Sequence, residues 1–179
     1  MKTLNNYISE RLNPRKLGPR VVKVEHKYFP TSRQELQYII GDHFKHKNYN
    51  FNDIDVSQIR DFSWLFSNRG KLKIDISQWT MTQAEDLSWM FYNTSFNGDI
   101  SDWDVSGVIT MCNMFEKSDF NGYISIWNVD SVEDLSGMFL NNKKFNQDLN
   151  GWHIKPGTLQ YHTFEGSPLE KHPPVWAKK

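Results

Sequence analysis

One unit of 24 to 25 residues recurs along the chain, and this repetition constrains the fold more than any other feature. Each copy opens with a Trp position, held by Trp79, Trp103 and Trp127 in three consecutive copies, and carries a Phe twelve residues later. Ile54 takes the Trp position in an earlier copy, and Trp152 opens a shorter last copy. The recurring phenylalanines are Phe66, Phe91, Phe115, Phe139 and Phe164. A single copy is too short to bury its own apolar side chains, so the copies must stack to make one core.

The apolar positions within each copy show which side chains face that core. Counted from the Trp position as position 0, positions 2, 5 and 8 are apolar in nearly every copy. Position 2, for example, is Val56, Met81, Val105, Val129 and Ile154. Stacked coils place such residues over one another at about the 4.8 Å spacing of neighbouring strands. The pattern predicts an α+β repeat solenoid of about five coils over residues 54–166.

Position 9 predicts how each coil bends. It precedes an apolar pair by one residue and is Ser63, Ser88, Cys112 and Ser136 in successive copies. A serine in this place is typical of a helix N-cap, so we expect each coil to run as strand, turn, short helical turn and return. The return segments carry a recurring asparagine after a Phe, at Asn97, Asn121 and Asn146. We expect these asparagines to form a ladder that satisfies backbone groups of neighbouring coils.

An amphipathic helix is predicted upstream of the repeats, within residues 31–48. Ser32 and Glu35 have the spacing of a capping box. The apolar face consists of Leu36, Ile39, Ile40 and Phe44. Because the first coil of a stack exposes its core, we expect this helix to cover it.

Charge and composition divide the chain further. It has 21 basic and 21 acidic residues, but residues 1–30 hold seven basic and two acidic residues, a balance of +5, so the remainder is at −5. We therefore expect a basic arm or leader at 1–27, a capping helix and lead-in at 28–53, the solenoid at 54–166 and a C-terminal tail at 167–179. Within the tail, Trp176 is expected to fold back over the last coil.

Composition also excludes several classes of protein. Seven Trp, seven Tyr and twelve Phe are too many for a disordered chain. No apolar run approaches the roughly 18 residues that a membrane-spanning helix needs. The first dozen residues lack the apolar stretch of a secretory signal, so we expect an intracellular or phage-virion location rather than secretion.

The residue pattern offers no catalytic, metal or cofactor site. His43 and His46 could share a metal, but no further ligands are spaced to complete the set, so we expect solvated helix histidines. The acidic run at 99–104 does not recur in the other copies and lacks the final Glu of a calcium loop. Cys112 is the only cysteine, which rules out an internal disulfide. We expect a protein that is not an enzyme and holds no cofactor.

The surface of the stack is the better candidate for function. Positions 6 and 7 form a mainly acidic row made of Arg60, Asp61, Glu85, Asp86, Ile109, Thr110, Glu133 and Asp134. Position 10 places Trp64 and Trp89 in consecutive coils, where two large rings can stand side by side and anchor a partner. Two alternatives remain open: the Trp pair can pack beneath the capping helix, and the acidic row can be an ordinary solvated face.

Two stretches resemble a known family. The segment WDVSGVITMCNMF, which begins at Trp103, resembles the repeats of BspA-like leucine-rich-repeat surface proteins. The stretch PTSRQELQYIIGDHF followed by FNDIDVSQIRDFSWLF resembles the helix and first repeat that open many members. Ile54, Cys112 and the Pro156-Gly157 pair depart from the family pattern. The resemblance implies a leucine-rich-repeat-like binding solenoid without enzymatic activity.

A shorter resemblance concerns the N-terminus. The stretch MKTLNNYISERL is similar to the leader of some proteins packaged inside tailed-phage heads. The sequence therefore predicts a protein–protein interaction module with a protein partner. The similarity of the N-terminus extends this prediction to a module associated with a phage virion. One alternative is a nucleic-acid-associated protein that binds through the arm, although the acidic body disfavours it. A second alternative is a bacterial cell-surface adhesin.

Overall fold

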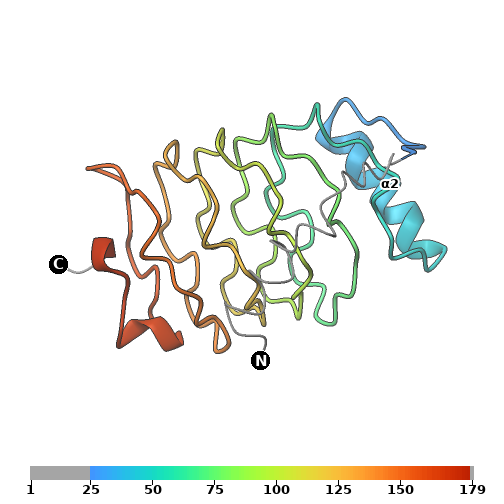
Figure 1. Ribbon diagram of the computed structural model, residues 1–179. Coiled ribbons are helices and arrows are strands. Elements are labelled where there is room, and N and C mark those ends of the chain that lie inside the picture. The colour runs from blue at the N-terminus through green and yellow to red at the C-terminus, as the bar shows by residue number, and fades with distance from the viewer. Residues whose placement is uncertain (1–24, 178–179) are drawn as a thin grey trace, which may run out of the picture.

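The computed structural model describes residues 25–177, so the basic arm expected at 1–27 lies almost wholly outside the described residues. The chain winds in successive coils that stack along one axis (Figure 1). The helices of the described part are α2 at Arg33–Lys45 and two 3₁₀ helices, η1 at Pro168–Glu170 and η2 at Val175–Ala177. No extended strand forms within 25–177, where neighbouring coils are joined by isolated parallel bridges instead.

The predicted phenylalanine column is present at the centre of the stack. Phe66, Phe91, Phe115, Phe139 and Phe164 stack with ring centroids 5.7, 5.6, 5.8 and 5.8 Å apart. Phe51 extends the column toward the N-terminal end, 6.0 Å from Phe66. The predicted apolar residues at positions 2, 5 and 8 are buried beside the column, except Ile154, which is half-buried. These residues form one continuous core.

A second column consists of tryptophans, and it is longer than the sequence analysis predicts. Each indole Nε1 donates to a carbonyl of the preceding coil, as from Trp127 to Ile100 and from Trp152 to Ile124, at 3.2 and 3.1 Å. Trp176 repeats this bond to Leu149 at 2.8 Å and stacks 6.2 Å from Trp152. Trp176 thus holds the Trp position of a further coil. The spacing of 24 residues between Trp152 and Trp176 was the sequence signal for it.

The short helical turn predicted after position 9 does not form, and this prediction was wrong. Residues 62–68 make β-turns, with bonds from Leu65 N to Phe62 O and from Ser67 N to Trp64 O. Ser63 does not cap a helix, because its own N–H donates to Asp61 Oδ1 at 2.8 Å. The aspartate two residues earlier therefore holds the bend as an Asx-turn.

Four backbone bonds join each coil to the next across these turns. In the first pair of coils, Phe62, Trp64, Phe66 and Asn68 donate their N–H groups to the carbonyls of Asp86, Ser88, Met90 and Tyr92. The same positions, 8, 10, 12 and 14, donate in the three following pairs. In these turns, each coil therefore presents carbonyls toward the N-terminal end and N–H groups toward the C-terminal end, whereas at position 6 the direction is reversed, as in the bond from Glu85 N to Arg60 O.

The asparagine ladder predicted on the return segments is also present. Asn97 Oδ1 accepts the backbone N–H of Asn121 at 2.8 Å, and Asn121 Oδ1 accepts that of Asn146 at 3.0 Å. Each side chain thus satisfies a backbone donor of the next coil.

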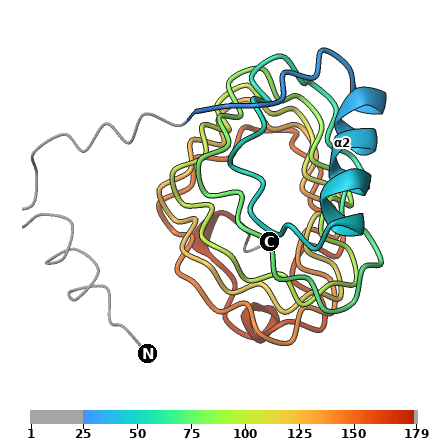
Figure 2. The same ribbon diagram turned by 90° about the vertical axis from the view of Figure 1, so that its right-hand side faces the viewer.

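Helix α2 covers the first coil, as predicted. Seen along the stack, the coils superimpose and α2 lies along one side of their outline (Figure 2). Ser32 is its N-cap and accepts the Glu35 N–H through its hydroxyl at 3.2 Å. Leu36 and Ile40 are fully buried against the core, whereas Ile39 and Phe44 are partly buried.

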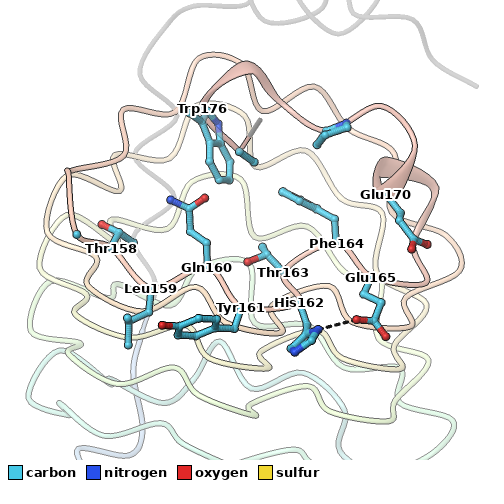
Figure 3. Close-up of a pocket in the computed structure, with 13 residues that line it drawn as sticks. Thr158, Leu159, Gln160, Tyr161, His162, Thr163, Phe164, Glu165, Glu170 and Trp176 are labelled. Atoms are coloured by element: carbon cyan, nitrogen blue, oxygen red, sulfur yellow. Dashed lines mark hydrogen bonds and ion pairs between the residues drawn. The ribbon is translucent and has the colours of Figure 1, made fainter. Parts of the chain in front are cut away.

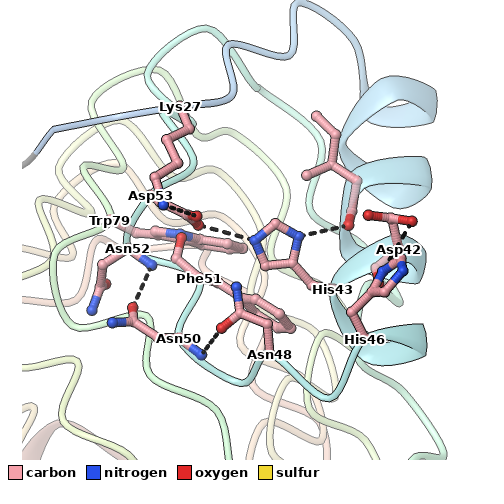
Figure 4. A network of polar contacts seen from close by, with 11 residues as sticks. Lys27, Asp42, His43, His46, Asn48, Asn50, Phe51, Asn52, Asp53 and Trp79 are labelled. Carbon is pink, nitrogen blue, oxygen red and sulfur yellow. Dashed lines mark hydrogen bonds and ion pairs between the residues drawn. The ribbon is translucent and has the colours of Figure 1, made fainter.

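His43 is not the solvated helix residue that the sequence analysis expects. Its side chain is only 3% exposed and lies between two acceptors, the Ile39 carbonyl at Nδ1 and Asp53 Oδ1 at Nε2, each at 3.0 Å (Figure 4). Both ring nitrogens of His43 thus face an oxygen atom within hydrogen-bond distance. His43 therefore fastens α2 to the lead-in, while His46 remains exposed.

Candidate functional site

Trp64 and Trp89 form an exposed aromatic cluster on the side of the stack. Their rings are stacked, with centroids 4.6 Å apart and planes 6° apart, and Tyr92 meets both rings edge-on. Trp64 is 48% exposed and Trp89 is half-buried, so the two rings do not belong to the core. The prediction that these two rings are neighbours is therefore confirmed.

The backbone beneath both tryptophans is left-handed. Trp64 and Trp89 each have a φ of 61°, and position 10 also has a positive φ in the later coils, at Asn113, Gly137 and His162. Gly and Asn adopt this conformation readily, whereas a bulky side chain costs about 1 to 2 kcal/mol. The fold therefore requires a left-handed backbone at position 10, and a Trp at this position lowers the stability of the folded state.

The aromatic cluster ends abruptly at the next two coils. Position 10 becomes Asn113, whose side chain donates to Glu116 at 2.7 Å, and then Gly137. A Cβ at Gly137 would lie 2.2 Å from Asn113 Nδ2, so any larger residue would displace the asparagine. The large rings at position 10 are thus confined to the first two coils.

The row at position 7 has a structural role that the sequence did not reveal. Asp61, Asp86, Thr110 and Asp134 are linked by parallel bridges in adjacent coils. Asp86 and Asp134 each accept the N–H two residues ahead through Oδ1 at 2.7 Å, as Asp61 does, and Thr110 does so through its hydroxyl at 3.3 Å. These side chains hold the turns in place, so their charge serves the fold as well as the surface.

Charges in the predicted acidic row are paired at one end only. Arg33 of α2 pairs with Asp61 at 3.2 Å, and Arg60 pairs with Glu85 in the next coil. Glu133 and Asp134 have no ion pair within the described part of the chain. They line a groove of about 560 Å³ together with Ile109, Thr110 and Leu159. Asp86 in the second coil and Glu133 and Asp134 in the fourth are thus the acidic residues of the row without an ion pair among residues 25–177.

The sole cysteine lies in an electronegative environment. Burial raises the pKa of the Cys112 thiol to about 11, and the charges of Asp134, Asp86 and Glu116 add to the effect. A thiol with such a pKa stays protonated at neutral pH and is a poor nucleophile. Cys112 is therefore unsuited to catalysis.

A larger hollow lies at the C-terminal end of the stack, where no site was predicted. Its volume is about 610 Å³, and Trp176, Phe164 and Gln160 are among the residues that line it (Figure 3). Leu159 and Tyr161 at its margin are 44% and 65% exposed. The sequence contained a signal for this site, since Leu159 and Tyr161 occupy positions 7 and 9, which are polar or a cysteine in every earlier coil.

Metal binding and membrane insertion were the other two possibilities for the described residues. No group of three or more His, Cys, Asp or Glu side chains within 25–177 is arranged to hold a metal. Over the same range, no helix has the length and apolar character needed to cross a membrane. The leader resemblance at 1–12 and the arm cations from Arg11 to Lys23 lie outside the described residues, whereas Lys27 contacts Asp53 at 3.9 Å.

Comparison with known proteins identifies the family of the chain. Residues 41–119 and again 93–171 match the family described as Mycoplasma protein of unknown function, DUF285. The two matches overlap, which agrees with a sequence built from equivalent repeats. Neither the curated proteins nor the solved structures gave a significant match. Since the matched segments together cover well over half of the sequence, the chain belongs to the DUF285 family of repeat proteins.

Proposed function

We propose that this chain is a protein–protein interaction module without enzymatic activity, built on a BspA-like, leucine-rich-repeat-like solenoid. The observation that carries the proposal is the exposed Trp64–Trp89 stack on left-handed backbone. Trp and Tyr supply most of the binding energy in many protein interfaces, where they form anchors at the centre of the contact. The cluster of Trp64, Trp89 and Tyr92 is therefore the proposed contact with a protein partner.

The backbone cost of Trp64 and Trp89, compared with their stacking energy, indicates that these residues do not stabilise the fold. A left-handed Trp costs about 1 to 2 kcal/mol, and stacking returns about 0.5 to 1.5 kcal/mol. Because two such residues together cost about 2 to 4 kcal/mol and share a single stack, the balance is unfavourable to the fold. Asn113 fills the same position in the third coil without exposing a ring. Strained residues that bring no stability cluster at functional sites. This supports a binding role for the pair.

The repeat architecture supports the same proposal. Buried columns at fixed positions leave the intervening residues as rows on one continuous surface, which repeat proteins commonly use for binding. The acidic side chains of Glu133 and Asp134, at the far end of the predicted row, add charge that selects among partners. We propose that the aromatic cluster provides affinity and the acidic row provides specificity.

The test replaces both tryptophans with the residue that the third coil already uses. In the double variant Trp64→Asn, Trp89→Asn, Asn adopts the left-handed backbone readily, so the free energy of unfolding should fall by no more than about 1 kcal/mol. Proteins captured from a lysate of the encoding organism should be lost with this variant, as quantified by mass spectrometry. Ile126→Asn, at an exposed apolar residue elsewhere, is the matched control and should keep them. If the double variant folds and captures the same proteins, the cluster is not the contact.

A further inference from the structure

The ring stack at position 10 has one uncovered end. Trp89 lies on one face of Trp64, and Tyr92 meets the two rings edge-on. Among residues 25–177, no other ring stacks on the opposite face of Trp64. The buried phenylalanine column differs, because Phe51 continues it toward the N-terminal end. The stack at position 10 therefore ends in a free indole face on the side away from Trp89.

A small pocket lies beside Trp64, between α2 and the first coil. Its volume is about 260 Å³, and Trp89 does not line it. The lining residues come from α2 and from the turn of the first coil, and they are Gln37, Ile40, Trp64, Leu65, Ser67 and Arg69. Ile40 and Leu65 are buried, so they give the pocket an apolar base. Pockets for small-molecule ligands usually measure roughly 300 to 1,000 Å³, so this smaller pocket suits one or two side chains of a protein partner.

Arg69 gives the pocket a positive charge. Its guanidinium lies 4.3 Å from the centroid of the Phe44 ring. It forms no ion pair or hydrogen bond with the part of the chain at 25–177. Burial lowers the pKa of Arg69, because the surrounding protein displaces water that would stabilise the charge. A carboxylate is the natural match, since it can accept two parallel N–H bonds from one guanidinium.

We propose that this pocket receives an aromatic side chain and a neighbouring carboxylate from the protein partner. The inference rests on the proposed function, because it names the chemistry of the segment that meets the Trp64–Trp89 stack. The partner's ring lies on the free face of Trp64 and gains there the kind of stacking energy that Trp89 gains on the other face. The carboxylate accepts from Arg69 and from the Gln37 amide. The partner therefore presents an acidic segment with an aromatic residue beside the acidic one.

Two other occupants fit the pocket less well. A cationic side chain can lie on an indole face, but the charge of Arg69 would repel it. A nucleic acid also combines planar rings with negative charge, but it needs several cations along its phosphates. Among the described residues that line the pocket, Arg69 is the only cation. One cation beside one ring face matches a single carboxylate beside a single aromatic side chain.

The test uses the peptide acetyl-Gly-Phe-Glu-Gly-amide as the probe, with two matched peptides in which Gln replaces Glu or Leu replaces Phe. Each is titrated into the full-length protein carrying ¹⁵N in its tryptophan side chains. The indole N–H signal of Trp64, identified by its loss in Trp64→Asn, reports binding. The probe should shift this signal saturably at millimolar concentration, and each matched peptide should bind about fivefold more weakly.

Two results of these titrations would overturn the proposal. One is the absence of binding by the probe, or equal binding of all three peptides. The other is a deoxythymidylate tetramer that binds more tightly than the probe, which would assign the pocket to nucleic acid.

A pair of charge variants locates the carboxylate. Arg69→Gln should weaken binding of the probe about fivefold and leave the affinity of the Gln-containing peptide unchanged, because only the probe carries the charge. Lys71→Gln, at an exposed lysine that does not line the pocket, is the control and should leave both affinities unchanged. Melting temperatures within a few degrees of the unmodified protein show that both variants fold. Equal effects of Arg69→Gln on the two peptides would refute the site.

The capture experiment separates this proposal from the proposed function. Loss of the captured proteins with Arg69→Gln, but not with Lys71→Gln, agrees with the peptide titrations. If Arg69→Gln keeps those proteins while the Trp64→Asn, Trp89→Asn variant loses them, the aromatic cluster is the contact and the acidic segment is refuted. If all three variants keep them, the proposed function fails as well.

Discussion

The two ends of the stack are covered by different groups. At the N-terminal end, α2 lies over the first coil, Arg33 donates to the Ser63 carbonyl of that coil, and His43 fastens the helix through Asp53. At the C-terminal end, Trp176 and Glu170 cover part of the last coil, and three N–H groups remain without a partner in the described residues, those of Gln160, His162 and Phe164. Across the turns, the edge toward the N-terminal end presents carbonyls, which suit a cationic donor such as Arg33. Across the same turns, the edge toward the C-terminal end presents N–H groups, which need acceptors.

The largest difference between the ends should appear in the phenylalanine column. Phe51 is fully buried beneath Phe44 and His43, with ring centroids 5.3 and 5.2 Å away, whereas Phe164 borders the hollow. Phe51→Ala should lower the free energy of unfolding by about 3 to 5 kcal/mol, since the cavity cannot collapse, and Phe164→Ala should cost about half of that. Chemical denaturation measures both. Equal losses would mean that the C-terminal end is as tightly closed as the N-terminal one.

The role of His43 as the fastener of α2 gives the next largest effect. His43→Ala removes two hydrogen bonds and leaves Asp53 without its imidazole partner, so the free energy of unfolding should fall by about 2 to 3 kcal/mol. His46→Ala, three residues further on the same helix and exposed, should change it by less than about 0.5 kcal/mol. Amide exchange should also quicken in the lead-in and first coil of the His43 variant. Equal losses in the free energy of unfolding for the two variants would show that His43 does not fasten α2 to the first coil.

The alkylation rate of the Cys112 thiol indicates whether the coils between the two ends stay closed. With the thiol pKa raised to about 11, only about one molecule in a thousand carries the thiolate at pH 8, against roughly one in four for a free cysteine. Alkylation at pH 8 should therefore be on the order of a hundredfold slower in the folded protein than in urea, and should quicken as pH rises toward 11. The rate is followed by mass spectrometry. Alkylation as fast as in urea would show that the middle of the stack opens.

The smallest expected effect concerns the acceptor that the chain itself supplies to the open end. Glu170→Ala should release the Gly166 N–H, which would then exchange faster and extend the unpaired row to a fourth position. Because Glu170 is exposed, the free energy of unfolding should change by less than about 1 kcal/mol. Lys171→Ala, at the adjacent exposed residue, is the control and should leave Gly166 exchange unchanged. An unaltered Gly166 rate in the Glu170 variant would mean that the carboxylate does not close the edge.

Part of the candidate surface could be predicted and part could not. The positions of Trp64 and Trp89 in consecutive repeats were enough to predict neighbouring rings, because equivalent residues of stacked coils lie over one another. The turn-holding role of Asp61 and Asp86 was not predictable in the same way, because the same residues also fit a solvated acidic face. A serine before an apolar pair likewise suggested a helix cap, but bonds to the next coil favour a turn in which Trp64 has a positive φ.

The sequence by itself determined the repeat register, the phenylalanine column and the capping helix. These depend on the spacing of apolar side chains and on local capping residues such as Ser32, which are properties of the chain before it folds. Only the tertiary structure decided that His43 is buried and that three N–H groups of the last coil lack an acceptor among residues 25–177. Each of these depends on what lies across a coil-to-coil contact, since the burial of a side chain and the partner of a backbone N–H are set by neighbours distant in sequence.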